Sequence, residues 1–168
     1  MKQIHITQGE YATGDDRGTV ISTLLGSCVS CCLWDLSAGV GGMNHILHAR
    51  VQADDPLQNG SGINTMEVLI NALIKLGATR SNLKAKAFGG AQMVSGLSDI
   101  GEQNTAFITN FLAQEGIPLI TQSFGGHQAR NLKFWPTSGR VMQKLTDVEV
   151  RWMEIEPSAQ SGHEVGLF

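Results

Sequence analysis

All three cysteines of the chain lie within five positions, in a stretch that opens with a tight turn and continues as an apolar strand. A Gly-Ser pair precedes Cys28, and it lets the backbone turn so that this thiol sits at the rim of the strand. Side chains alternate along residues 29–34, so Cys31 and Cys32 should point to opposite faces. Three cysteines this close on one strand cannot form a structural disulfide, so we expect reduced thiols.

The residues after this strand predict a return strand that carries a histidine. Residues 35–39 supply a turn, and residues 40–48 form the second half of a β-hairpin. Cys28 begins the first strand and His45 lies well into the second, so the two can face each other across the pair. A thiol beside an imidazole can act as a nucleophile with an acid-base partner, and the amides of Ser27 and Cys28 are candidate donors to an oxyanion.

A purely structural role for the same residues stays open at this point. Buried cysteines are usually inert, and this is the interpretation that we prefer for Cys31 and Cys32. A single histidine on a strand is more often a core or surface group than a catalyst. The residues alone therefore do not decide whether Cys28 and His45 are catalytic.

Two other chemistries share these residues. The cysteines, together with His45 and His48, have the spacing of zinc ligands, and Cys28-x-x-Cys31 has the spacing of a redox motif. Residues three apart on a strand point to opposite faces, so such pairs converge on one ion only from a loop or turn. The redox motif belongs beside a β-α-β pattern, whereas a strand follows here. We therefore predict no metal and no cofactor.

The rest of the chain predicts one mixed domain, residues 1–168, of the α/β (α+β) class. Further strand patterns lie at residues 4–7, 19–21, 84–88, 119–124, 131–135 and 140–145, and helical patterns at 65–76 and 102–115. The first helix has a narrow polar stripe and is expected to be largely buried. Residues 49–62 are expected to form a loop beside the site, and residues 157–168 a flexible tail.

The composition limits the partners of the protein. Twelve Lys and Arg against 15 Asp and Glu give a net charge of −3, and no basic run is present that would follow a nucleic acid backbone. No apolar stretch is long enough to cross a bilayer, and the first residues lack the features of a signal peptide. We expect a cytoplasmic protein that is not inserted in a membrane.

Five short motifs resemble the CheD family of chemoreceptor glutamine deamidases, in the family's order and over about residues 19–145. They are Leu25–Val29, Gly42–His45, Lys86–Ala91, Ile100–Asn104 and Gly125–Gly126. The resemblance implies a layered α/β/β/α sandwich, which the family shares with the catalytic domain of the cytotoxic necrotizing factor toxins. It also implies protein-glutamine glutaminase activity without a cofactor or metal.

The resemblance assigns three catalytic residues. The cysteine of the family's Gly-Ser-Cys motif is the nucleophile and the histidine of the next motif is its base, which correspond to Cys28 and His45. A hydroxyl residue six positions before the cysteine, usually threonine, is the third member, which corresponds to Ser22. The neighbouring Thr23 would take this role only after a one-residue slip, which turns a side chain to the opposite face. We therefore predict Ser22.

The implied substrate is the cytoplasmic helical domain of chemoreceptors, where conversion of Gln to Glu with release of ammonia creates sites for methylation during chemotactic adaptation. The alternative is an adaptor that docks on chemoreceptors or on a CheC-like phosphatase, with little catalysis. Departures from the family pattern at His48-Ala49, Gln103 and His127 lie at the edge of the predicted site and bear on substrate preference. Paired glycines at 41–42, 89–90 and 125–126 predict tight turns or close backbone approaches.

Overall fold

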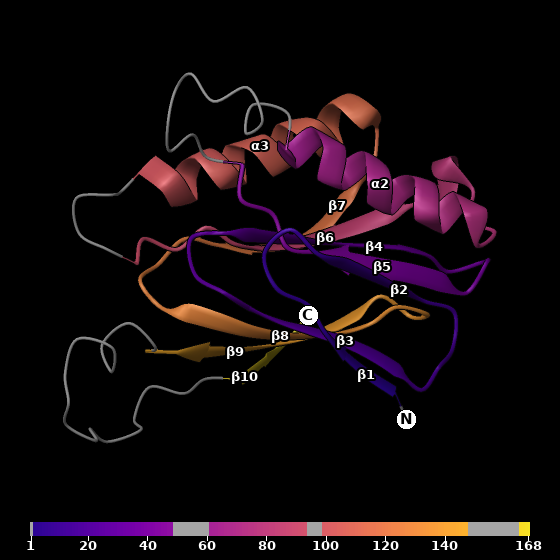
Figure 1. The fold of residues 1–168 in the computed structure, drawn as a ribbon, viewed down its shortest axis with the longest axis horizontal. Coiled ribbons are helices and arrows are strands. Elements are labelled where there is room, and N and C mark those ends of the chain that lie inside the picture. Colours follow the sequence, from indigo (N-terminus) through magenta and orange to yellow (C-terminus); the bar gives the residue numbers. More distant parts are fainter. Residues whose placement is uncertain (1, 49–60, 94–98, 148–164) are drawn as a thin grey trace.

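The computed structural model describes residues 2–48, 61–93, 99–147 and 165–168, and these residues form two five-stranded sheets packed face to face (Figure 1). Both α-helices of the described residues lie over the outer face of one sheet, so the layers run helices, sheet, sheet (Figure 1). This arrangement confirms the predicted mixed class and the two packed sheets, whereas the second helical layer of the predicted α/β/β/α sandwich does not occur among the described residues.

The strand order of the sheet away from the helices is β1-β3-β8-β9-β10, and that of the sheet beneath the helices is β2-β5-β4-β6-β7. The first sheet consists of β1 (Lys2–His5), β3 (Thr19–Leu25), β8 (Ala129–Trp135), β9 (Arg140–Thr146) and β10 (Val165–Leu167). The second consists of β2 (Tyr11–Gly14), β5 (Val40–Asn44), β4 (Val29–Asp35), β6 (Lys84–Gly89) and β7 (Leu119–Phe124). The pairs β1–β3 and β6–β7 are parallel, and the other neighbours are antiparallel.

The helices are α2 (Ser61–Lys75) and α3 (Asp99–Glu115), with a short 3-10 helix η1 (Arg80–Asn82) after α2. Gly77 follows α2 with φ +115°, the left-handed conformation expected of a glycine that ends a helix. The outward side of α2 exposes Ile63, Val68 and Ile74, which are 50%, 37% and 41% accessible. The prediction that this helix is largely buried is therefore wrong, because apolar side chains on the side turned away from the sheet remain accessible.

Strand β4 contributes to two hydrophobic cores. One face packs Val29, Cys31 and Leu33 under the helices, while the other packs Cys32 and Trp34 between the two sheets. This alternation confirms that the two cysteines point to opposite faces. The predicted β4–β5 hairpin is also confirmed, with Cys32 opposite Met43 and Trp34 opposite Gly41.

The end of the chain differs in part from the predicted flexible tail. Residues Val165–Leu167 form β10, which pairs antiparallel with β9. Phe168 packs edge-on against Phe88, and its carbonyl oxygen accepts a hydrogen bond of 2.9 Å from Lys86 Nζ. The sequence did not predict this strand, because the residues before it are mostly polar and the apolar end is short. Residues 157–164, and most of the predicted loop 49–62, lie outside the described residues.

Candidate active site

The turn of residues 26–28, between β3 and β4, is fixed through its carbonyl groups. Each of the three carbonyls accepts a hydrogen bond from another segment, at 3.1, 2.8 and 2.9 Å; the donors are the Ala91 amide, Asn104 Nδ2 and the Gly90 amide. The amides of Ser27 and Cys28 donate to no described residue. The turn is thus held rigidly while two neighbouring N–H groups are left to bind a ligand oxygen.

Glycine is required where β6 passes this turn. Gly89 has φ +119°, and a Cβ atom there would lie 2.2 Å from the Cys28 carbonyl oxygen. Gly90 has φ +68° and donates its N–H to that same oxygen. The predicted close backbone approach at this glycine pair is confirmed, and it lies against the turn of residues 26–28.

Cys28 is the accessible member of the three cysteines. It is partly exposed, whereas Cys31 and Cys32 are fully buried. Its thiol donates a hydrogen bond of 3.9 Å to the side-chain oxygen of Gln8. Burial raises the pKa of the Cys28 thiol from 9.0 to about 11, so the thiol is protonated near neutral pH.

His45 lies between the two sheets, where a threonine of the opposite sheet holds its ring. Its Nδ1 is 2.8 Å from the hydroxyl oxygen of Thr23, and this hydroxyl donates its proton to the Ile6 carbonyl oxygen at 2.7 Å. A hydroxyl has one proton, so the Thr23 oxygen accepts its second hydrogen bond from Nδ1–H of His45. The network therefore assigns the proton to Nδ1 and leaves Nε2 as the free base.

Burial keeps this imidazole neutral. The side chain of His45 is 6% exposed, and burial lowers its pKa from 6.5 to about 4, with a further lowering from His5 and an opposing effect of Glu10. A neutral imidazole can remove the proton of a neutral thiol during attack, without a resting ion pair.

The backbone register brings Cys28 and His45 onto one face. Val29 and Ile46 exchange two backbone hydrogen bonds of 3.0 and 2.7 Å. Cys28 and His45 are therefore diagonal neighbours across the strand pair, a relation with a Cα separation of roughly 7–8 Å that side chains can span. The predicted pairing of these two residues agrees with this register.

The segment between β1 and β2 closes one side of the site. The Gly9 amide donates to the His45 carbonyl at 2.9 Å, and the His45 amide donates to the Glu10 carbonyl at 3.1 Å. Ile6 of the same segment accepts the hydroxyl of Thr23. Residues 6–10 thus fix the backbone of His45 by hydrogen bonds and place Gln8 next to the Cys28 thiol. Sequence reasoning missed this segment, because no motif marks it.

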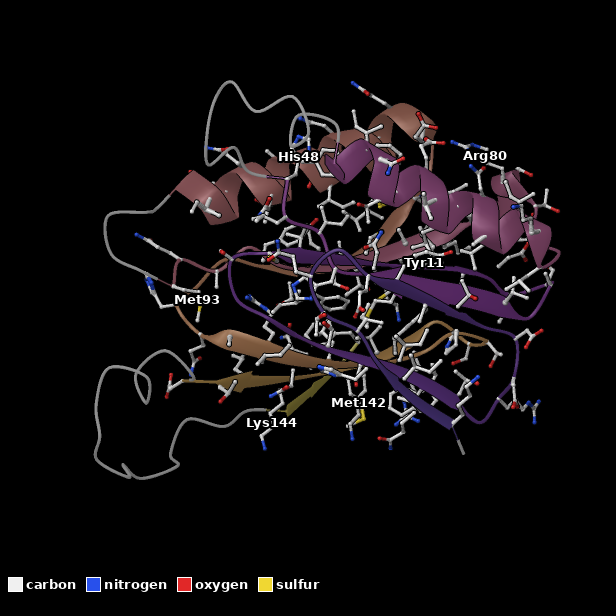
Figure 2. The ribbon with its side chains drawn as sticks, viewed as in Figure 1. Tyr11, His48, Arg80, Met93, Met142 and Lys144 are labelled. Carbon is white, nitrogen blue, oxygen red and sulfur yellow. The ribbon has the colours of Figure 1, made fainter. Side chains whose placement is uncertain are left out.

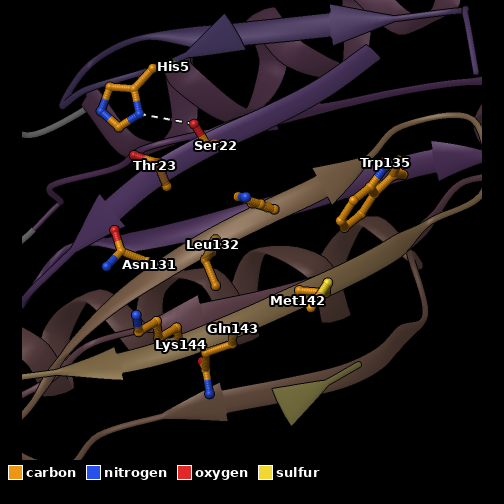
Figure 3. Close-up of a pocket in the computed structure, with 10 residues that line it drawn as sticks. His5, Ser22, Thr23, Asn131, Leu132, Trp135, Met142, Gln143 and Lys144 are labelled. Carbon is orange, nitrogen blue, oxygen red and sulfur yellow. Dashed lines mark hydrogen bonds between the residues drawn. The ribbon is translucent and has the colours of Figure 1, made fainter. Parts of the chain in front are cut away.

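Ser22, predicted as the third site residue, lies on the face of β3 that points away from His45. Its hydroxyl contacts His5 Nδ1 at 3.1 Å, beside a depression of about 540 Å³ on the outer face of the sheet (Figure 3). Figure 2 shows Met142 and Lys144, which also line this depression, on the same outer side. Odd-numbered residues of β3 face the core, as buried Ile21 shows, so Thr23 is the hydroxyl residue that reaches His45.

Asn104 links the turn of residues 26–28 to the segment that follows β5. This fully buried residue of α3 donates from Nδ2 to the Ser27 carbonyl and accepts the His48 amide at Oδ1, both at 2.8 Å. Its place in the Ile100–Asn104 motif was recognised in the sequence, but not its role. A buried asparagine at the start of an otherwise apolar helix face is a signal that could have indicated it.

His48 belongs to the helix side of the sheet and not to the His45 pair. Its ring stacks on Phe107 of α3, with centroids 4.0 Å apart, and Figure 2 shows it next to the helices. His48 and Gln103 also line a depression of about 420 Å³. His127 contacts the Gln92 carbonyl at 3.2 Å. Two of the three departures from the family pattern, His48 and Gln103, thus lie together beside α3.

No group of three or more His, Cys, Asp or Glu side chains that could hold a metal ion occurs in the part of the chain that the structure describes. Within that same part, no helix is both long enough and apolar enough to span a membrane.

Comparisons with known proteins relate the chain to one family. Residues 51–145 match the family model CheD, described as CheD chemotactic sensory transduction. A "Probable chemoreceptor glutamine deamidase CheD" of Rhizobium johnstonii is 49% identical over 155 residues, which cover 89% of this chain and 84% of the relative. A protein of the same name in Caulobacter vibrioides is 47% identical over 151 residues, covering 88% and 80%. A crystal structure of Neisseria meningitidis protein NMB0706 aligns with a TM-score of 0.45 and 9% identity, covering 76% of this chain and 64% of that protein.

Proposed function

The chain belongs to the CheD family, and from this premise we propose that it is a chemoreceptor glutamine deamidase in which Cys28 is the nucleophile, His45 its base and Thr23 the residue that orients His45. The observation that carries this proposal is the chain of hydrogen bonds from Ile6 through Thr23 to His45 Nδ1, which leaves Nε2 unprotonated on the face that His45 shares with Cys28. The substrate is the carboxamide of a receptor glutamine, and the product is glutamate.

The first half of the reaction forms a thioester. Nε2 of His45 takes the thiol proton as Cys28 Sγ adds to the carboxamide carbon. The raised pKa of the thiol and the lowered pKa of the imidazole make this transfer part of the attack. The amides of Ser27 and Cys28 donate to the oxygen of the tetrahedral intermediate. The C–N bond then breaks, and the imidazolium gives its proton to the departing ammonia.

The second half consumes water. His45, neutral again, removes a proton from a water molecule that adds to the thioester carbon, and the Cys28 sulfur leaves and regains its proton. The net change is Gln and water to Glu and ammonia. Throughout, Thr23 accepts Nδ1–H of His45, so the ring keeps one tautomer and one orientation.

The proposed substrate surface is a helical one. Cys28 is partly exposed beside the loop of residues 6–10, so the site opens to the surface and can accept a glutamine that projects from a rigid helix. We place the reaction in the cytoplasm, where the helical signalling domain of a chemoreceptor lies. The alternative function is that of an adaptor, which would bind chemoreceptors or a CheC-like phosphatase with little catalysis.

The test is incubation of the purified protein with a cognate receptor domain, followed by peptide mass spectrometry of its glutamines. The wild-type protein should convert glutamine to glutamate, and Cys28→Ala should abolish the conversion. The matched control is Cys32→Ala, which removes a thiol from β4, the strand that follows Cys28, but not the nucleophile. Retained conversion in Cys28→Ala would disprove the assignment. An adaptor would instead keep its receptor binding and its cellular phenotype in this variant.

A further inference from the structure

The side-chain carboxamide of Gln8 lies next to the thiol of Cys28, the proposed nucleophile. The side-chain oxygen of Gln8 accepts the hydrogen bond of the Cys28 thiol at 3.9 Å. Gln8 is exposed to solvent, so water reaches its side chain and a released ammonia can leave. A glutamine carboxamide next to this thiol is the chemical group on which the proposed reaction acts.

The backbone keeps that carboxamide near the thiol. Gly9 and Glu10, which follow Gln8, form backbone hydrogen bonds with His45. The Ile6 carbonyl oxygen accepts a hydrogen bond from the Thr23 hydroxyl. The carboxamide is thus tethered to the site by its own chain, and a tethered group has an effective concentration in the millimolar range or above. Exposed side chains change rotamer within picoseconds to nanoseconds, so the Gln8 carboxamide samples other orientations relative to the sulfur.

We propose that Gln8 is an intramolecular substrate of Cys28 and is converted to glutamate by the protein itself. The inference rests on the function proposed above and adds a modification site to it. It requires no co-reactant other than water, and it requires the sulfur to reach the Gln8 carbonyl carbon at about 3–3.5 Å, the near-attack distance.

The reaction at Gln8 follows the same two steps as the reaction with a receptor glutamine. Cys28 Sγ adds to the side-chain carbonyl carbon of Gln8 while His45 takes the thiol proton. The C–N bond breaks, ammonia leaves with that proton, and a thioester joins residues 8 and 28. Water then adds with His45 as base, the sulfur leaves as the thiol, and position 8 carries a carboxylate.

The tryptic peptide that contains Gln8 makes the test specific. Cleavage after Lys2 and Arg17 gives a peptide whose amide side chains are only Gln3 and Gln8. Gln3 is exposed on β1 and serves as the internal control in the same peptide. Full-length wild-type protein and Cys28→Ala are incubated in ¹⁸O-enriched water, with the receptor assay run in parallel, and fragment ions locate the new carboxylate.

We expect ¹⁸O at position 8 in wild type, no conversion at position 3, and a rate at position 8 at least about tenfold lower in Cys28→Ala. Receptor deamidation without change at Gln8 would overturn this inference and leave the proposed function standing. Equal conversion of Gln8 in wild type and Cys28→Ala would show spontaneous hydrolysis and would also overturn it. Failure of both receptor and Gln8 conversion would remove the proposed function and this inference with it.

Discussion

A hydroxyl with one proton decides how the histidine of the site works. Thr23 gives its proton to the Ile6 carbonyl and must therefore accept from His45, which fixes the tautomer of the ring. Ser22, one residue earlier, has the same chemistry on the wrong face of β3. The distinction between the two is one of strand register and not of residue type.

Replacing Thr23 should therefore impair catalysis, whereas replacing Ser22 should not. Thr23→Val keeps the shape but cannot accept Nδ1–H, and we expect kcat to fall on the order of 10², part of the contribution of acid-base catalysis. Thr23→Ser should restore most of the activity. Ser22→Ala is the control and should stay within about twofold, because surface changes of this kind rarely affect a buried site. Equal losses in Thr23→Val and Ser22→Ala would refute the role of Thr23.

The thiol should titrate at unusually high pH. Burial raises the pKa of Cys28 to about 11, so alkylation of the native protein should keep accelerating above the ordinary value of 9.0. Iodoacetamide rates measured across pH, with peptide mapping, give this profile, and protein unfolded in urea provides the reference. Cys31 and Cys32 should react only after unfolding, since both are fully buried. A native midpoint well below 9.0 would mean that a resting thiolate–imidazolium pair exists, contrary to the neutral pair described above.

At the scale of elements, helix α3 holds the active site from behind. Asn104 bridges the Ser27 carbonyl and the His48 amide, so one helical side chain links the segment after β5 to the turn of residues 26–28. The same turn is held by Gly90 and Ala91 of the segment after β6. The position of the Cys28 amide donors therefore depends on α3 and β6 as well as on the turn itself.

Removing this bridge should cost both stability and activity. Asn104→Ala leaves two partly buried backbone groups without this partner, which should cost on the order of 1 kcal/mol per group in unfolding free energy. Asn110→Ala is the matched control, because Asn110 is exposed on the same helix and should change stability by less than about 0.5 kcal/mol. Urea unfolding measures both, and the receptor assay should show a lower kcat for Asn104→Ala alone. An Asn104→Ala protein with unchanged kcat would show that the bridge is only structural.

At the scale of the whole molecule, the sequence predicted those structural features that depend on a few neighbouring residues. The β4–β5 hairpin, strand β7 and the opposite faces of Cys31 and Cys32 follow from alternation and turn residues, which act over a few positions. The pairing of β3 with β8, and the contact of Thr23 with His45 from the other sheet, are long-range. The sequence offers no periodic signal for such contacts, so spacing to the cysteine pointed to Ser22. The exposed side of α2 was missed for the same reason, since a helix pattern does not tell how many partners the helix has.

Folding as a whole should be linked to the titration of His45. In the native protein burial lowers the pKa of His45 to about 4, while in the unfolded chain it has the ordinary value of 6.5. Above pH 6.5 both states hold this ring neutral, and its contribution to stability is complete. As the pH falls from 6.5 to 4 the unfolded state binds a proton that the native state does not, so the free energy of unfolding falls by about 3 kcal/mol in all.

Urea unfolding at several pH values in this window should show this loss. The slope should largely disappear in His45→Gln and persist in His127→Gln, whose exposed side chain lies outside the core; equal slopes in wild type and His45→Gln would contradict a buried neutral imidazole.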